Sequence, residues 1–234
     1  MLRKSIIFNL LMLSLPGLQA QYISEVLEYK PAPGQFINAS PWGIPGSTAS
    51  IMGDVKGILC LGAFGGTVVF RFEEPVENHP DNPFGVDFTI FGNPLNDWSE
   101  PGVVWVMRDD NENGSPDDTW YELAGSDYHF SSTKTAYRVT YSNPGDVVAR
   151  DVPWTDQFGN SGILRANSTH DQPYYPMKDT FPEIPENEYT LSGTLITAAV
   201  DVNDPPVHQS LIRAFGYADN QLRGIPPYTV PDNP

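Results

Sequence analysis

The stretch Thr67-Val68-Val69-Phe70-Arg71-Phe72 decides the fold class of this chain. Val68, Phe70 and Phe72 alternate with Thr67, Val69 and Arg71. Successive side chains of a β-strand point to opposite faces, so this alternation predicts a strand with one face in a core and Arg71 in water. The pair Gly65-Gly66 marks a turn before the strand.

Further segments on both sides are predicted strands because they are rich in β-branched and aromatic residues and are bounded by turn signals. No long stripe of period 3.6 appears, and only Thr48–Gly57 is expected to hold a helical turn. The pattern predicts an all-β fold, an antiparallel two-sheet sandwich of the jelly-roll type with long loops and little helix. The expected strands are Tyr22–Tyr29, Val86–Phe91, Val103–Met107, Trp120–Leu123, Tyr137–Tyr141, Val147–Val152, Tyr189–Leu195 and Leu211–Tyr217.

The first residues read as a targeting segment. Arg3 and Lys4 precede the apolar run Ile6–Leu15, and a Pro16-Gly17 break leads to Ala20. This order is typical of a secretory signal peptide over residues 1–20, and the run is too short to span a bilayer. We expect an exported protein, at the cell surface, in the periplasm or outside the cell, with no transmembrane segment. A β-sandwich over residues 21–222 and a proline-rich connector over residues 223–234, where the chain is truncated, complete the expected organisation.

Charge and cysteine content limit the partners. The chain carries 29 acidic against 13 basic residues, a formal charge of −16, and loss of Arg3 and Lys4 makes the mature protein more acidic still. Such a surface repels phosphate backbones and attracts divalent cations, so nucleic acid is not an expected partner. Cys60 is the single cysteine, which excludes an internal disulfide, and its apolar surroundings predict a buried thiol.

One segment points to specific chemistry. Residues 109–118 read Asp-Asp-Asn-Glu-Asn-Gly-Ser-Pro-Asp-Asp. Asp109, Asn111 and Asn113 place side-chain oxygens at positions one, three and five, and Gly114 follows at six, as in the first half of an EF-hand calcium loop. The sequence therefore predicts a Ca²⁺ site. Its expected ligands are Asp109, Asn111, Asn113, the carbonyl of Ser115, Asp117 and Asp118.

The loop departs from the EF-hand pattern at its end. The twelfth position, which carries a bidentate glutamate in an EF-hand, is Trp120. Both flanks have strand composition, so we expect a long turn between two strands. If the loop folds back, Asn93 and Glu100 could supply further oxygens. The alternative is a plain hairpin in which Asn113-Gly114 makes the turn and the acids are solvated.

Motifs of catalysis are not found. No two histidines share metal-ligand spacing, and the chain has no Gly-x-Ser-x-Gly elbow, phosphate-binding loop or dinucleotide fingerprint. We therefore predict no catalytic residue and no enzyme, although carboxylate pairs for glycoside hydrolysis stay open in a chain this acidic. The stretch Trp154–Met177 is a better candidate for ligand binding, because aromatic rings beside amides hold sugars or flat ligands. Its candidates are Trp154, His170, Tyr174 and Tyr175, with packing as a lid over the sandwich edge as the alternative.

Four motifs carry a family resemblance: Phe64–Phe70, Asp87–Asn93, Trp98-Ser99-Glu100-Pro101-Gly102 and Trp120–Gly125. Together, over Ser50–Tyr217, the chain resembles secreted cell-surface proteins of Bacteroidetes that are associated with PKD domains and are often encoded beside cobalamin-uptake outer-membrane transporters. The resemblance implies a non-enzymatic, calcium-bearing sandwich that serves corrinoid capture, with an outer-membrane transporter complex as partner. Two other functions stay open: a carbohydrate-binding module or glycan-active enzyme, and a structural adhesion domain.

Overall fold

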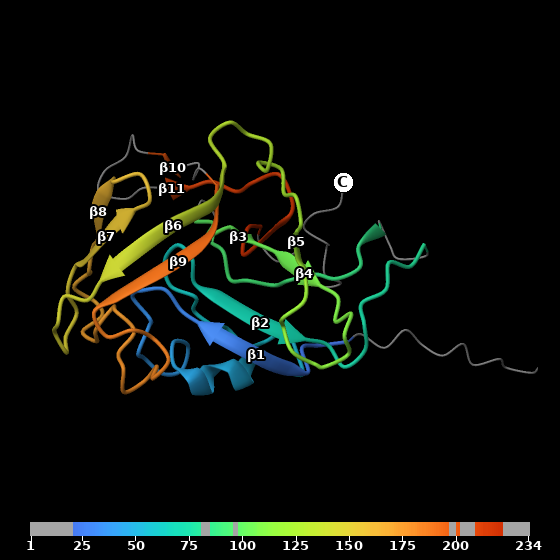
Figure 1. Cartoon of the computed structure of the whole chain (residues 1–234), viewed down its shortest axis with the longest axis horizontal. Coiled ribbons are helices and arrows are strands. Elements are labelled where there is room, and N and C mark those ends of the chain that lie inside the picture. Colours follow the sequence, from blue (N-terminus) through green and yellow to red (C-terminus); the bar gives the residue numbers. More distant parts are fainter. Residues whose placement is uncertain (1–20, 81–84, 96–97, 197–199, 202–208, 222–234) are drawn as a thin grey trace, which may run out of the picture.

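The computed structural model describes residues 21–80, 85–95, 98–196, 200–201 and 209–221 (Figure 1). The predicted signal peptide (1–20) and connector (223–234) lie outside these residues. The described chain is rich in strands, with one short 3₁₀ helix, and its strands pair antiparallel throughout. The elements are β1 (Glu25–Lys30), η1 (Pro45–Ile51), β2 (Thr67–Arg71), β3 (Gly102–Val103), β4 (Trp105–Met107), β5 (Trp120–Glu122), β6 (Lys134–Ser142), β7 (Val152–Asp156), β8 (Ser161–Leu164), β9 (Glu188–Leu195), β10 (Val200–Asp201), β11 (Gln209–Ser210) and β12 (Tyr217–Ala218).

The largest sheet has the strand order β8-β7-β6-β9. Its central pair follows the alternation of the sequence: Tyr137, Val139 and Tyr141 of β6 are buried, and Arg138 between them is exposed. In the register of the two strands, Val139 lies opposite Leu191 and Tyr141 opposite Tyr189. Buried side chains of two strands thus meet on one face, which is what stabilises a sheet. The predictions for Tyr137–Tyr141 and Tyr189–Leu195 are confirmed.

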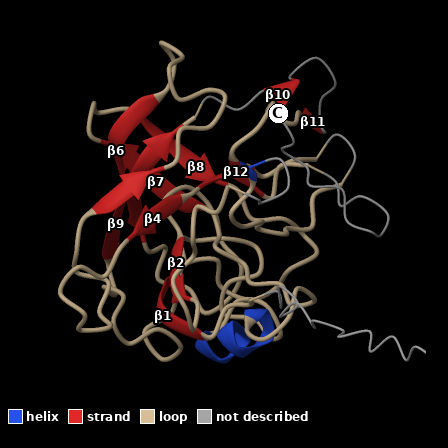
Figure 2. Cartoon of the chain, turned by 90° about the vertical axis from the view of Figure 1, so that its right-hand side faces the viewer, coloured by secondary structure: helices blue, strands red, loops and turns tan. Residues whose placement is uncertain are grey.

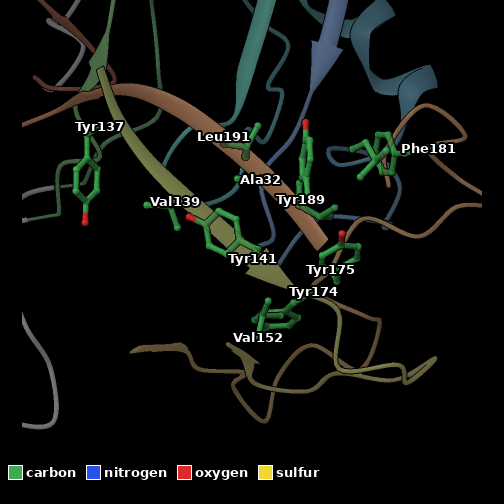
Figure 3. Close-up of a cluster of buried hydrophobic side chains, with 12 residues drawn as sticks. Ala32, Tyr137, Val139, Tyr141, Val152, Tyr174, Tyr175, Phe181, Tyr189 and Leu191 are labelled. Carbon is green, nitrogen blue, oxygen red and sulfur yellow. The ribbon is translucent and has the colours of Figure 1, made fainter. Parts of the chain in front are cut away.

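The core on that face is built mainly from tyrosines and from loop residues (Figure 3). Buried tyrosines stabilise a core only if their hydroxyls find hydrogen-bond partners. The Tyr141 hydroxyl donates to the carbonyl of Phe64 at 3.0 Å, and that of Tyr175 donates to Pro185 at 2.7 Å. These bonds attach loops to the sheet. The other buried members are Ala32, Ile37, Tyr137, Val139, Val152, Tyr174, Phe181, Ile184, Tyr189 and Leu191.

A second, two-stranded sheet pairs β1 with β2, so the predictions for Tyr22–Tyr29 and Thr67–Phe72 are confirmed. The chain enters β2 through Gly65, whose φ is +90° and at which a Cβ would lie 2.5 Å from the Cβ of Leu191. Only glycine fits this approach to β9. η1 lies beside β1 (Figure 2), and it is the helical turn that the sequence placed a few residues later.

Three predicted strands are wrong. Residues 86–91 and 211–216 form no strand, and Val147–Val152 reaches a strand only at Val152, where β7 begins. Alternation marks a face that can be buried, but a strand also needs a neighbour with which its backbone pairs. The stretch Trp154–Met177, for which no strand was predicted, opens with the hairpin of β7 and β8. Val103–Met107 is split between β3 and β4, and Trp120–Leu123 is confirmed as β5.

The described strands form one sheet of four and four sheets of two. Loops make up most of the trace (Figure 2). Within the described ranges, no helix is long and apolar enough to cross a membrane.

Candidate metal-binding loop

The acidic loop connects β4 to β5, and these two strands pair with each other. Val106 lies opposite Tyr121 and Met107 opposite Trp120. This confirms the prediction that the loop is a long turn between two strands. The loop lies beside the end of β2 (Figure 1), and Arg71 is the last residue of that strand.

The first half of the loop curls around its own side chains. The Asp109 carboxylate accepts the backbone N–H of Asn113 at 3.1 Å and that of Gly114 at 2.8 Å. The Asn113 N–H is shared with the side-chain oxygen of Asn111 at 3.0 Å, and the Asn113 oxygen accepts the N–H of Ser115 at 2.7 Å. Gly114 has φ +72°, the left-handed conformation that the sharp bend requires. The oxygens at positions one and three therefore lie close together, on the N–H of Asn113, while the oxygen at position five accepts the next free N–H, that of Ser115.

Asp117 closes this group from the other side of the loop. One of its carboxylate oxygens accepts the side-chain amide of Asn111 at 3.3 Å, and both accept that of Asn113 at 3.2 and 3.3 Å. A half-turn of either amide would turn its oxygen toward this place, but it would also replace the oxygen that now accepts a backbone N–H, from Asn113 or from Ser115. Four side chains, from Asp109, Asn111, Asn113 and Asp117, thus form one convergent group whose hydrogen bonds meet at Asn113.

Other polar residues of the loop have different partners. The Asp110 carboxylate turns outward and accepts Nε of Arg108 at 2.5 Å; this hydrogen bond, and then the negative charge, raises the pKa of Arg108. The Asp118 carboxylate accepts the N–H of Asp110 at 3.1 Å and so joins the two ends of the loop. Asp118, a predicted ligand, therefore lies outside the convergent group. Ser115 joins the group through its N–H, and its carbonyl as a ligand stays a prediction.

Sequence reasoning missed one residue of this region. Arg71 is exposed, as expected, but its guanidinium also lies against the loop: a Cβ at Gly114 would lie 2.9 Å from Nη1 of Arg71. The same guanidinium pairs with Glu25 of β1 at 2.6 Å. A positive charge of the β1–β2 sheet thus lies beside the bend of the loop. No periodicity signals this contact, because it depends on how two hairpins meet.

The convergent group suits a hard cation. Ca²⁺ takes six to eight oxygens from carboxylates, side-chain amides, carbonyls and water. Two carboxylates and two carboxamides meet in the loop, and water can complete the shell of an exposed site. In the described residues no cluster of three or more His, Cys, Asp or Glu side chains could hold a metal ion. A site for zinc or another transition metal, which needs such side chains, therefore has no support there.

The residues predicted to bind a ligand lie in other surroundings. Tyr174 and Tyr175 are core residues, 2% and 1% exposed, so protein covers their rings. Trp154 is half-buried, and Gly162 of the neighbouring strand lies against its ring. The His170 ring packs edge-on against Phe36, 4.7 Å between centroids. The structure does not bring these four side chains to one open surface; packing, the alternative left open by the sequence, describes the two tyrosines.

Asn93 and Glu100 lie beside Asp219 instead of the loop. The backbone N–H of Asn93 donates to the Asp219 carboxylate at 2.7 Å, and that of Glu100 donates to the Asp219 carbonyl at 3.1 Å. Burial, followed by the charge of Asp219, raises the pKa of Glu100, and burial also raises that of Asp219. Glu100, which is exposed, and Asp219, which is half-buried, thus form a separate pair of acids near a cleft of about 330 Å³ that Asp219 and Tyr217 help to line.

Comparison with known proteins adds no identity to this geometry. No protein-family model matches the chain, and a search of curated proteins finds no match.

Proposed function

We propose that this chain is an exported, calcium-binding β-module of the cell surface, in which the ion fixes the loop between β4 and β5. The observation that carries the proposal is the convergence of Asp109, Asn111, Asn113 and Asp117 around the bend at Gly114. Asp110, which lies between Asp109 and Asn111 in sequence, points away from this group and toward Arg108. Alternate side chains thus turn inward, as a chain curled round an ion requires.

The ion has a structural role in this proposal. Asp109 and Asp117 carry like charges that are brought together by the loop. Two guanidinium groups lie near the loop, and each has another acidic partner: Arg71 pairs with Glu25, and Arg108 pairs with Asp110. A divalent ion would neutralise both carboxylates and couple its binding to the order of the loop. The β4–β5 hairpin would then keep a fixed position against β1 and β2.

The module itself we propose to be a jelly-roll sandwich that binds a ligand. The support is that the core lies between the four-stranded sheet and the β1–β2 side of the molecule, since Leu191 of β9 meets the turn that leads into β2. By the family resemblance, the proposed ligand is a corrinoid and the partner an outer-membrane transporter. Titration with cobalamin tests the proposed corrinoid ligand. Saturable binding would support it. The absence of binding would contradict it and would leave the proposed calcium site unaffected.

Thermal melting with and without calcium tests the proposed function. At a calcium concentration of 100 times Kd, binding to the folded state adds about 2.7 kcal/mol, which corresponds to a Tm rise of roughly 5–11 °C for a domain of this size. EDTA should reverse the rise. A melting curve that is the same in EDTA and in millimolar calcium would contradict the proposal.

Two substitutions in the same loop serve as test and matched control for the calcium site. Asp117→Asn removes a charge that points into the convergent group, whereas Asp110→Asn removes one that points outward to Arg108. The first should abolish most of the calcium-dependent rise and the second should leave it nearly whole. If the two variants lost the same part of the calcium-dependent Tm rise, calcium binding would depend only on the total charge of the loop. That result would contradict a site with specific ligands.

A further inference from the structure

A second cleft lies far from the acidic loop in sequence and is enclosed by three segments. β1, η1 and the turn at residues 181–184 surround a space of about 370 Å³. This volume is within the range of small-molecule sites. Its walls are mainly apolar, with Val26, Pro45, Phe181, Pro182 and Ile184 among them.

Tyr189 of β9 brings an unsatisfied polar group to this cleft. The residue is 7% exposed and lines the cleft, and its hydroxyl has no hydrogen-bond partner. Figure 3 shows that the Tyr189 hydroxyl points away from Val152. Burial, followed by the charge of Glu28, raises the pKa of Tyr189 to about 12. Glu28 lines the same cleft as Tyr189.

The Tyr189 hydroxyl differs from those of other tyrosines in and around the core, which have hydrogen-bond partners. The hydroxyls of Tyr141, Tyr175 and Tyr29 each donate to a backbone carbonyl, at 3.0, 2.7 and 2.5 Å. Leaving a buried hydroxyl unpaired costs free energy that a phenylalanine would avoid. The position of Tyr189 is therefore explained if its partner comes from outside the chain.

The rim of the cleft adds charged groups to the apolar walls. Lys30 pairs with Glu28 at 2.5 Å, and Glu183 stands exposed on the opposite turn. Carboxylates accept hydrogen bonds from hydroxyl groups, the ammonium of Lys30 donates them, and the Tyr189 hydroxyl does both. A suitable ligand has several hydroxyls around a compact body with an apolar face that can pack on Phe181 and Pro182.

We propose that this cleft binds a neutral sugar, one or two rings in size. A sugar ring offers C–H groups to the apolar wall and hydroxyls to the acids and to Tyr189. Phosphorylated ligands are disfavoured by Glu28, Glu183 and the net charge of −16. A plain hydrocarbon chain would leave the Tyr189 hydroxyl without a partner.

Titration of the full-length mature protein against a panel of neutral mono- and disaccharides tests this proposal. The readout is ¹H–¹⁵N NMR shifts, with inorganic phosphate and a capped tripeptide as separate arms. The expected result is saturable binding of at least one sugar, with shifts in β1, η1 and residues 181–184. Tyr189→Phe should weaken that binding about tenfold, the loss of one hydrogen bond, while the Tm stays the same or rises, because no internal bond is lost and an unpaired buried hydroxyl is removed.

Tyr141→Phe is the matched control, since it removes the same atom from a tyrosine that donates inside the core. It should lower the Tm and leave the sugar affinity as it is. The proposal is overturned if no sugar binds, if only the peptide or phosphate binds, or if Tyr189→Phe binds the sugar as tightly as the natural chain. Because the cleft shares no residue with the calcium loop, failure here leaves the proposed calcium function standing.

Discussion

The four-stranded sheet and the acidic hairpin are both antiparallel β-structures, but different forces hold them. The sheet buries tyrosines and aliphatic residues from two long strands, and loop residues complete its core. The hairpin of β4 and β5 has only three residue pairs, and beyond them its loop is held by side-chain oxygens that accept backbone N–H groups. One region is stabilised by burial and the other by polar contacts among exposed, mostly acidic groups.

This difference predicts which region depends on the solution. Apolar burial responds little to ions, whereas carboxylates brought close together repel each other unless a cation lies between them. We therefore expect the stability of the sheet to be set by its packing and the order of the loop to be set by calcium.

The largest effect should come from the sheet. Tyr141→Ala empties a core position that is 3% exposed and removes the bond to Phe64, so unfolding free energy should fall by about 3–5 kcal/mol. Tyr121→Ala, at a tyrosine of β5 that is 63% exposed, should cost at most about 0.5 kcal/mol. Urea denaturation in EDTA measures both. Similar losses for the two variants would show that the sheet is not the stabilising centre.

A smaller effect should come from the bend of the loop. Gly114→Ala puts a Cβ on a residue with φ +72° and 2.9 Å from Nη1 of Arg71, which should cost about 1–2 kcal/mol and weaken calcium binding. Gly145→Ala is the control, because Gly145 has φ +81° but nothing within 4 Å of the added atom. It should cost a similar amount without changing calcium affinity. Denaturation and calcium titration of both variants separate backbone strain from the site; equal calcium affinities would contradict the account.

The smallest effect concerns an acidic turn that needs no ion. Burial opposes ionisation of Asp156, but hydrogen bonds from Asn160, Tyr137 and Phe158 outweigh it and lower its pKa to about 2. Since the folded pKa is depressed, this contribution to stability is complete above about pH 4 and is lost as the pH falls through about 2. Tyr137→Phe should raise the Asp156 pKa toward 3.8, as followed by carboxyl NMR. If the Asp156 pKa stays near 2 in the variant, the hydrogen bond from Tyr137 is not a cause of the low pKa.

The sequence predicted the regions in which local pattern and long-range pairing agree. Tyr137–Tyr141 and Tyr189–Leu195 alternate strictly, and the structure pairs them with each other. Val86–Phe91 alternates as well but forms no strand, because a single run does not show whether a partner strand will lie beside it.

The candidate sites show the same limit. The convergence of Asp109, Asn111 and Asn113 follows from alternate spacing within one loop, so it was predictable. The approach of Arg71 to Gly114 and the position of the Tyr189 hydroxyl depend on how separate segments pack, so no local pattern indicated them.

Calcium titration followed residue by residue in ¹H–¹⁵N NMR spectra tests the central claim most directly. The account predicts saturable shifts of the amides of Asn113, Gly114 and their neighbours in residues 109–118, while the amides of β6 and β9 stay in place. Shifts that are absent, or that spread evenly over the acidic surface without saturation, would contradict a built calcium site in the loop.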